Sequence, residues 1–148
     1  MDNASLPAPE TSSVITPSLV TVVEKRGIRE VNPRTQVYHA VHPYLTQAIH
    51  YTLLKFKDMA FVWFGSSAGG LKSMTAAMPM PTIREKAVST SLLSADMEDP
   101  CPVIAKRLSA RYEQPIYLSS DLFPSTDPDL RIFAERHLAS FIKQHLGK

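Results

Sequence analysis

Residues 58–93 of the chain read DMAFVWFGSSAGGLKSMTAAMPMPTIREKAVSTSLL. This segment opens with the densest apolar run of the protein, residues 59–64, which contains two phenylalanines, a valine and a tryptophan. An aromatic and β-branched run that ends in a glycine-rich segment, here residues 65–70, is typical of a buried β-strand followed by a turn. Whether the glycine-rich segment performs chemistry or only turns the chain separates an enzyme from a binding protein.

The segments before this strand follow the two-residue repeat of β-structure. Residues 36–41 alternate, so that Val37 and Val41 lie on one side of a strand. Residues 44–57 alternate as well, with Leu45, Ile49, Tyr51 and Leu53 on one side. Their Tyr, Ile and Thr content favours a strand, with a helix as the alternative. Residues 19–23 are long enough for a further short strand.

Beyond the glycine-rich segment the pattern is mixed. Residues 71–80 contain alanines that suit a helix and prolines that end one, so helix and strand both stay open. If residues 65–70 form a hairpin turn, residues 71–80 pair back on residues 60–64. Residues 88–93 and 115–119 are short and extended, and we expect both to be strands.

Two Asp-Pro pairs predict the starts of two helices, because aspartate is a common N-cap and proline suits the first helical turn. The first pair begins at Asp99, and the second begins at Asp127. The second helix is the clearest element of the sequence, and we expect it to end near Gly147. Its apolar face combines residues at helical spacing: Leu130, Phe133, Ala134, Leu138, Phe141, Ile142 and His145.

Strands come in a run before the helices, which predicts an α+β fold. We expect a mostly antiparallel sheet or sandwich of about six strands, with two α-helices packed on it. Residues 1–17 are rich in Pro, Ser and Thr, and predict a disordered N-terminal tail. Residues 18–148 then form a single domain.

Composition narrows the function. The net charge of +2 gives no basic stripe of the kind that nucleic-acid-binding proteins carry, so we expect no nucleic-acid partner. No apolar run approaches the length of about 20 residues that a membrane-spanning helix needs. The single cysteine, Cys101, and the absence of a signal-peptide pattern at the start favour an intracellular protein.

One motif suggests an enzyme. The glycine-rich segment fits G-x-S-x-G with Ser67 as a nucleophile, and Asp121 or Asp127 and then His137 follow in the order of a serine hydrolase. Too few residues follow Ser67 for the large parallel sheet of that fold, and His137 lies on or beside the apolar face of the second helix, where packed histidines are common. A small serine hydrolase that uses Ser67 is therefore the alternative, and the favoured prediction is a protein without enzymatic activity.

Phosphate and metal sites are less well supported. A phosphate-binding loop needs lysine directly after its second glycine, whereas Leu71 separates Lys72 from Gly70. His39 and His42 lie three residues apart, on opposite faces of a strand, so they cannot hold one metal ion together. We expect no cofactor and no metal.

Five stretches occur in a fixed order along the chain: IHY at residues 49–51, FVWFG at 61–65, VSTSLL at 88–93, IAKRLSAR at 104–111 and IYLS at 116–119. Together they resemble the proteasome assembly chaperone 4 family. The resemblance covers residues 35–146. The N-terminal extension and the loop at residues 66–70 depart from the family pattern, so the resemblance gives Ser67 no support as a nucleophile.

The resemblance implies a chaperone without enzymatic activity, in the cytoplasm and also in the nucleus. It implies a heterodimer with a proteasome assembly chaperone 3-like protein, which binds α-type subunits of the proteasome core particle, especially the fifth. The pair promotes assembly of the α-ring. The residues that we expect to bind partners lie in or beside the motifs: Trp63, Ser89, Thr90, Ser91, Arg107 and Arg111.

Overall fold

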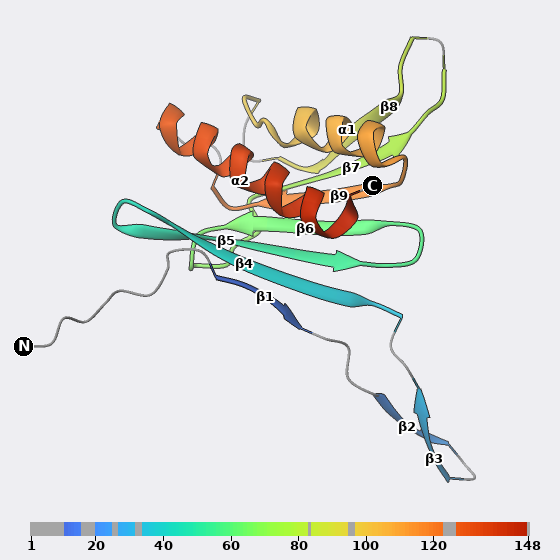
Figure 1. The fold of residues 1–148 in the computed structure, drawn as a ribbon. Coiled ribbons are helices and arrows are strands. Elements are labelled where there is room, and N and C mark those ends of the chain that lie inside the picture. The colour runs from blue at the N-terminus through green and yellow to red at the C-terminus, as the bar shows by residue number, and fades with distance from the viewer. Residues whose placement is uncertain are drawn as a thin grey trace, which may run out of the picture.

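The apolar run of residues 60–64 becomes the central strand of the protein. The computed structural model describes residues 34–82, 84–94, 97–122 and 127–147, together with three N-terminal strands. The central strand, β6, has three neighbours in the sheet on each side (Figure 1). A position in the middle of the sheet is where a strand with large apolar side chains at successive residues is most stable, because both of its faces can be buried.

Nine strands and two helices make up the described part of the chain (Figure 1). The strands are β1 Thr11–Ile15, β2 Val20–Glu24, β3 Gly27–Val31, β4 Gln36–Tyr44, β5 Gln47–Lys55, β6 Ala60–Gly65, β7 Ser73–Pro79, β8 Ala87–Leu93 and β9 Ile116–Ser120. The helices are α1 Cys101–Tyr112 and α2 Pro128–Leu146. The α+β fold, with a mostly antiparallel sheet and two packed helices, is therefore confirmed.

Seven of the strands form one open sheet in the order β1-β4-β5-β6-β9-β7-β8, and β2 pairs with β3 in a separate hairpin. All neighbours in the large sheet are antiparallel except β6 and β9, which are parallel. Within residues 71–80, Ser73–Pro79 form strand β7, but the conditional prediction that this run pairs back on β6 is wrong. The later strand β9 lies between β6 and β7, and its Ile116 and Leu118 are fully buried there.

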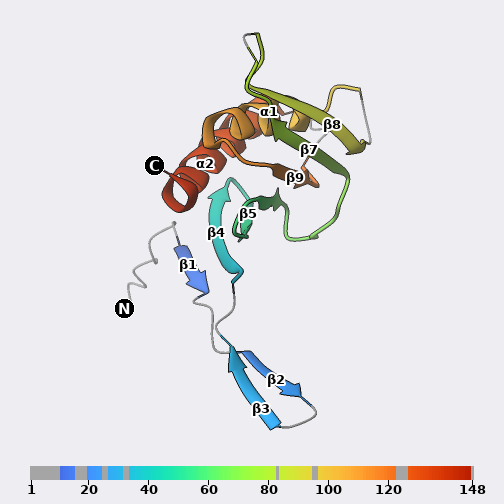
Figure 2. The same ribbon diagram turned by 90° about the vertical axis from the view of Figure 1, so that its right-hand side faces the viewer.

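Both helices cover the same face of the sheet, as the two views in Figures 1 and 2 show. Helix α1 packs on β7, β8 and β9, and α2 packs on β4 and β5. Every second residue of the inner strands points into the core between the helices and the sheet, as expected from the two-residue repeat of a β-strand. Its largest members from the strands are Ile49, Tyr51, Leu53, Val62, Phe64, Ile116 and Leu118.

Of the two predicted aspartate N-caps, one is observed and the other is shifted by one residue. The Asp127 side chain accepts hydrogen bonds from the amides of Asp129 and Leu130, so the predicted N-cap of α2 is confirmed. Helix α1 has Pro100, not Asp99, at its N-cap position. Asp99 still serves this end of the helix, because its Oδ1 accepts a hydrogen bond of 2.9 Å from the amide of Cys101.

Two N-terminal predictions meet the structure only in part. Residues 11–15 of the predicted disordered tail form β1, which pairs with β4. The rest of the tail, residues 1–10 and 16–17, lies outside the described residues, and the division into tail and domain stays a prediction. The short strand expected at residues 19–23 is β2, and its hairpin with β3 extends the strand content beyond the six strands expected.

Protonation of His145 should destabilise the fold. Its ring lies between Tyr38 and Phe141, at centroid distances of 4.1 and 4.9 Å, and its Nε2 is buried with no hydrogen-bond partner among the described residues. Burial lowers the pKa of His145, and the nearby Lys55 ammonium lowers it further. The unfolded chain therefore binds this proton more readily than the folded chain, so the free energy of unfolding falls as the pH drops below about 6.5.

Urea unfolding at pH 7.5 and at pH 5.5 measures this effect. We expect the wild type to be less stable at pH 5.5, and His145→Phe, which keeps an aromatic ring between Tyr38 and Phe141, to lose less stability over the same interval. Burial also lowers the pKa of His39, with a smaller contribution from His50, so part of the pH dependence should persist in the variant. Identical pH dependence in both proteins would assign the effect to other groups.

Candidate partner interface

The face of the sheet opposite the helices carries an apolar surface. Along each strand, the residues that alternate with the buried core residues point to this side. The strand register places Leu54, Phe61 and Tyr117 beside one another on β5, β6 and β9. A shallow hollow on this face is lined only by apolar or aromatic residues. We call the surface formed by these six residues the open face: Leu54, Phe56, Met59, Phe61, Met74 and Tyr117. An antiparallel sheet that faces water normally carries polar residues on that side, so this surface is suited to being covered by another protein.

Trp63 lies on the same side of the sheet, in the row next to Phe61. Its register partners are Thr52 on β5 and Ser119 on β9. The indole Nε1 donates a hydrogen bond of 3.0 Å to the carbonyl oxygen of Gly70. The predicted partner-binding residue Trp63 is thus placed at the margin of the open face, where it also holds the glycine-rich loop.

The glycine-rich loop is organised by a carboxylate from a distant part of the chain. Asp121, which follows β9 and is 6% exposed, accepts hydrogen bonds from the amide and the hydroxyl of Ser66, at 2.7 and 2.8 Å. It also accepts a hydrogen bond of 3.2 Å from the amide of Gly70. Three donors on one carboxylate form a charge-assisted network, so the loop has a defined structural role in joining the ends of β6 and β9.

The residues of the predicted hydrolase are not brought together in the described part of the chain. Asp121 is bonded to Ser66, and not to the exposed Ser67. His137 lies on α2, where its ring packs against His42 and Phe133 at centroid distances of 4.2 and 4.3 Å. Asp127 caps α2. A serine nucleophile needs a base within hydrogen-bond reach, and Ser67 has no histidine neighbour among its described contacts.

Ser89, Thr90 and Ser91 lie on β8, which is the last strand of the sheet. Their register partners on β7 place Ser89 and Ser91 on the helix side and Thr90 on the side of the open face. Among the described strands, β8 pairs only with β7. The predicted VSTSLL motif therefore supplies a sheet edge whose outer backbone groups face no described strand, which is a surface of a different kind from the open face.

Arg107 and Arg111 lie on neither of these surfaces. They are exposed on α1, one helical turn apart, and line a shallow groove between α1 and α2 with Glu135 and Leu138. The guanidinium of Arg111 also lies 5.7 Å from the centroid of the Tyr112 ring. The six predicted partner-binding residues thus divide among the open face, the sheet edge and the helical layer, and one flat interface cannot contain them all.

The partner-binding residues expected from the sequence include Trp63 but none of the open-face residues. The signal for them was present, because β6 carries large apolar side chains at successive positions and not only at alternate ones. A strand that is apolar on both sides is expected to be covered on both sides. The two helices cover only one side.

The described residues provide neither a metal-binding cluster nor an exposed cysteine. Within them, no group of three His, Cys, Asp or Glu side chains could hold a metal ion, and no helix has the length and hydropathy to cross a membrane. Cys101 is buried and accepts a hydrogen bond of 3.3 Å from the hydroxyl of Ser73. Burial raises the pKa of its thiol to about 12, so the group is an unreactive part of the core.

Comparison with known proteins agrees with the fold. The chain resembles, with a TM-score of 0.58 and 19% sequence identity, a chain in the crystal structure of a novel chaperone complex for yeast 20S proteasome assembly. The match covers 78% of the present chain and 100% of the other, and at this identity it shows a shared fold. No curated protein matches the sequence.

The sequence profile described as proteasome assembly chaperone 4 matches residues 48–122. The matched region is just over half of the chain, and it includes the open face, the glycine-rich loop, the edge strand β8 and helix α1. The protein therefore belongs to the proteasome assembly chaperone 4 family.

Proposed function

We propose that this protein is a non-enzymatic assembly chaperone that forms a one-to-one heterodimer with a proteasome assembly chaperone 3-like protein. The pair binds α-type subunits, especially the fifth, and promotes assembly of the α-ring of the core particle, in the cytoplasm and the nucleus. Membership of the family supports the role in proteasome assembly. The observation that supports a heterodimer is the open face, an apolar sheet surface on the side away from both helices.

The shape and chemistry of the open face suit a second sheet as its occupant. Two sheets pack face to face at about 10 Å and interdigitate their side chains, which requires a flat apolar surface without bulky loops over it. Leu54, Phe61 and Tyr117 lie side by side across three central strands and provide such a surface. A chaperone of similar fold, with an open face of its own, would bury both surfaces at once.

Binding of an α-type subunit explains how such a pair would direct assembly. A chaperone that occupies one surface of a subunit excludes incorrect neighbours from it, and it leaves when the correct neighbour competes for that surface. This activity needs no nucleophile, metal or cofactor. It is consistent with the structural role of the glycine-rich loop and with the inert environment of Cys101.

The substitution Tyr117→Asp should prevent heterodimer formation. It places a charge in the middle of the open face, where the bound partner would remove it from water without a counter-ion. The matched control is Val103→Asp, which introduces the same charge on the exposed side of α1. We expect size-exclusion chromatography with light scattering to give a one-to-one complex for the wild type and the control, and separate monomers for Tyr117→Asp.

Circular dichroism of the isolated variants establishes that each is folded, and Tyr117→Ser replaces Tyr117→Asp if the latter is not. A folded Tyr117 variant that binds the partner as tightly as the wild type would exclude the open face as the interface. Calorimetric titration of an α-type subunit into the wild-type pair tests the second half of the proposal. Covalent labelling of Ser67 by a serine-hydrolase probe would instead support the alternative of a small hydrolase.

A further inference from the structure

The turn between β4 and β5 has an unusual residue at its tip. Tyr44 pairs with Gln47, so the hairpin loop consists of only Leu45 and Thr46. Leu45 has a φ of 52°, and the residue is 86% exposed. The alternating pattern of residues 44–57 placed Leu45 in line with the buried Ile49 and Tyr51, and the turn removes it from that line.

A leucine at this position is unfavourable for the isolated chain in two ways. Two-residue hairpins need a left-handed backbone at their first loop residue, a conformation that Gly, Asn and Asp adopt more easily than a branched side chain. The apolar side chain also remains in water, where it gains nothing from burial. Strained residues of this kind concentrate at functional sites, where the surrounding structure holds them in place.

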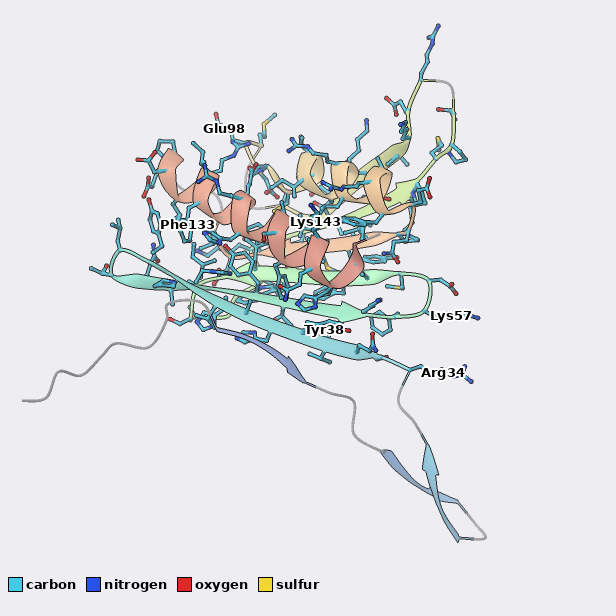
Figure 3. The ribbon with its side chains drawn as sticks, viewed as in Figure 1. Arg34, Tyr38, Lys57, Glu98, Phe133 and Lys143 are labelled. Carbon is cyan, nitrogen blue, oxygen red and sulfur yellow. The ribbon has the colours of Figure 1, made fainter. Side chains whose placement is uncertain are left out.

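The surrounding structure does hold this turn in place. The hydroxyl of Tyr44 donates a hydrogen bond of 3.1 Å to Oδ2 of Asp127, and the Tyr44 ring packs on Phe133 at a centroid distance of 4.9 Å. Asp127 in turn caps α2, so the hairpin is tied to the start of that helix (Figure 3, where Phe133 is labelled). These contacts of Tyr44 hold the backbone of the tip in place before any partner arrives, which lowers the entropic cost of binding.

We propose that Leu45 is an anchor that inserts into an apolar pocket on the α-type subunit held by the chaperone. This inference rests on the proposed function. The hairpin tip lies at one end of the strands, and Tyr44 turns toward α2 on the helix side of the sheet. The tip therefore stays free when a second sheet covers the open face, which assigns it to the α-type subunit.

The decisive variant is Leu45→Asn, because asparagine tolerates a left-handed backbone and removes the apolar side chain. We expect its melting temperature to rise by about 3 °C as the backbone strain is relieved. We expect its heterodimer to bind an α-type subunit about tenfold more weakly by calorimetric titration, as for the loss of an interface hot spot. Leu45→Gly should weaken binding in the same way.

The matched control is Leu71→Asn, which removes another exposed leucine, at a position without a left-handed backbone. It should change neither the melting temperature nor the affinity. The proposal that Leu45 is an anchor is overturned if Leu45→Asn binds the subunit as tightly as the wild type. It is also overturned if Leu45→Asn loses no more affinity than Leu71→Asn. A wild-type pair that binds no α-type subunit overturns the proposed function itself, and the anchor with it.

Discussion

The substitution Phe141→Ala should unfold a large fraction of the protein or leave it insoluble. Phe141 is 3% exposed on α2, where its ring lies 6.0 Å from that of Tyr51 and 4.9 Å from that of His145. Removal of a buried phenylalanine side chain costs about 3–5 kcal/mol, through lost transfer free energy and the cavity left behind. That cost is comparable to the whole free energy of unfolding of a small domain, about 5–15 kcal/mol.

Thermal unfolding followed by circular dichroism measures the loss, and we expect the melting temperature to fall by about 10 °C or more. The control is Ile132→Ala on the same helix, whose side chain is mostly exposed and should be removed at little cost to stability. Unchanged melting of Phe141→Ala would mean that α2 does not pack on β5 as described, and that the apolar stripe of the helix serves another surface.

The substitution Gly65→Ala, which adds a single methyl group, should destabilise the fold almost as much as Phe141→Ala. A Cβ atom on Gly65 would overlap with Oδ1 of Asp121 and lie 2.6 Å from Cζ2 of Trp63. The Asp121 carboxylate cannot move aside freely, because it accepts hydrogen bonds from Ser66 and Gly70. Overpacking and the loss of hydrogen bonds to a charged group together cost about 3 kcal/mol, so we expect Gly65→Ala to melt about 10 °C below the wild type.

Gly70→Ala is the matched control, since this glycine also faces Asp121. Its added Cβ would lie 3.5 Å from the Cβ of Asp121, which is an ordinary van der Waals contact. Differential scanning calorimetry of the two variants therefore compares the same substitution with and without steric overlap. Equal melting temperatures for both would show that Asp121 is not fixed in the position that the structure gives it.

Local patterns in the sequence were enough to predict the elements but not their neighbours. Strand β6 was predicted because its apolar residues form a continuous run that ends in glycine, and helix α2 because its apolar side chains recur at helical spacing. Both patterns depend only on nearby positions. The position of β9 between β6 and β7 was not predictable in this way, since strand order is set by contacts between residues far apart in the chain. The role of Asp121 was missed for the same reason, because Ser66 lies more than fifty residues before it.

The candidate interface was predicted least well. Trp63 was expected to bind a partner and does lie beside the open face, but Phe61 and Tyr117 were not singled out. Apolar residues on both sides of β6 indicate that both sides are covered, but they do not indicate which side the helices cover, so the side left for a partner could not be identified from the sequence alone. Leu45 was assigned to an apolar stripe because alternation carries no information on where a two-residue turn interrupts it.

The parallel pairing of β6 with β9 also has a consequence for synthesis of the chain on the ribosome. About 50 residues separate the end of β6 from the start of β9, and β6 has no neighbour on that side until β9 has emerged. At about 5–20 residues per second, translation of this interval takes roughly 3–10 seconds. During this delay the nascent chain exposes a central strand, containing Phe61, Val62 and Trp63, whose β9 side is unpaired, so this assembly chaperone is itself prone to misassociation until β9 has been synthesised.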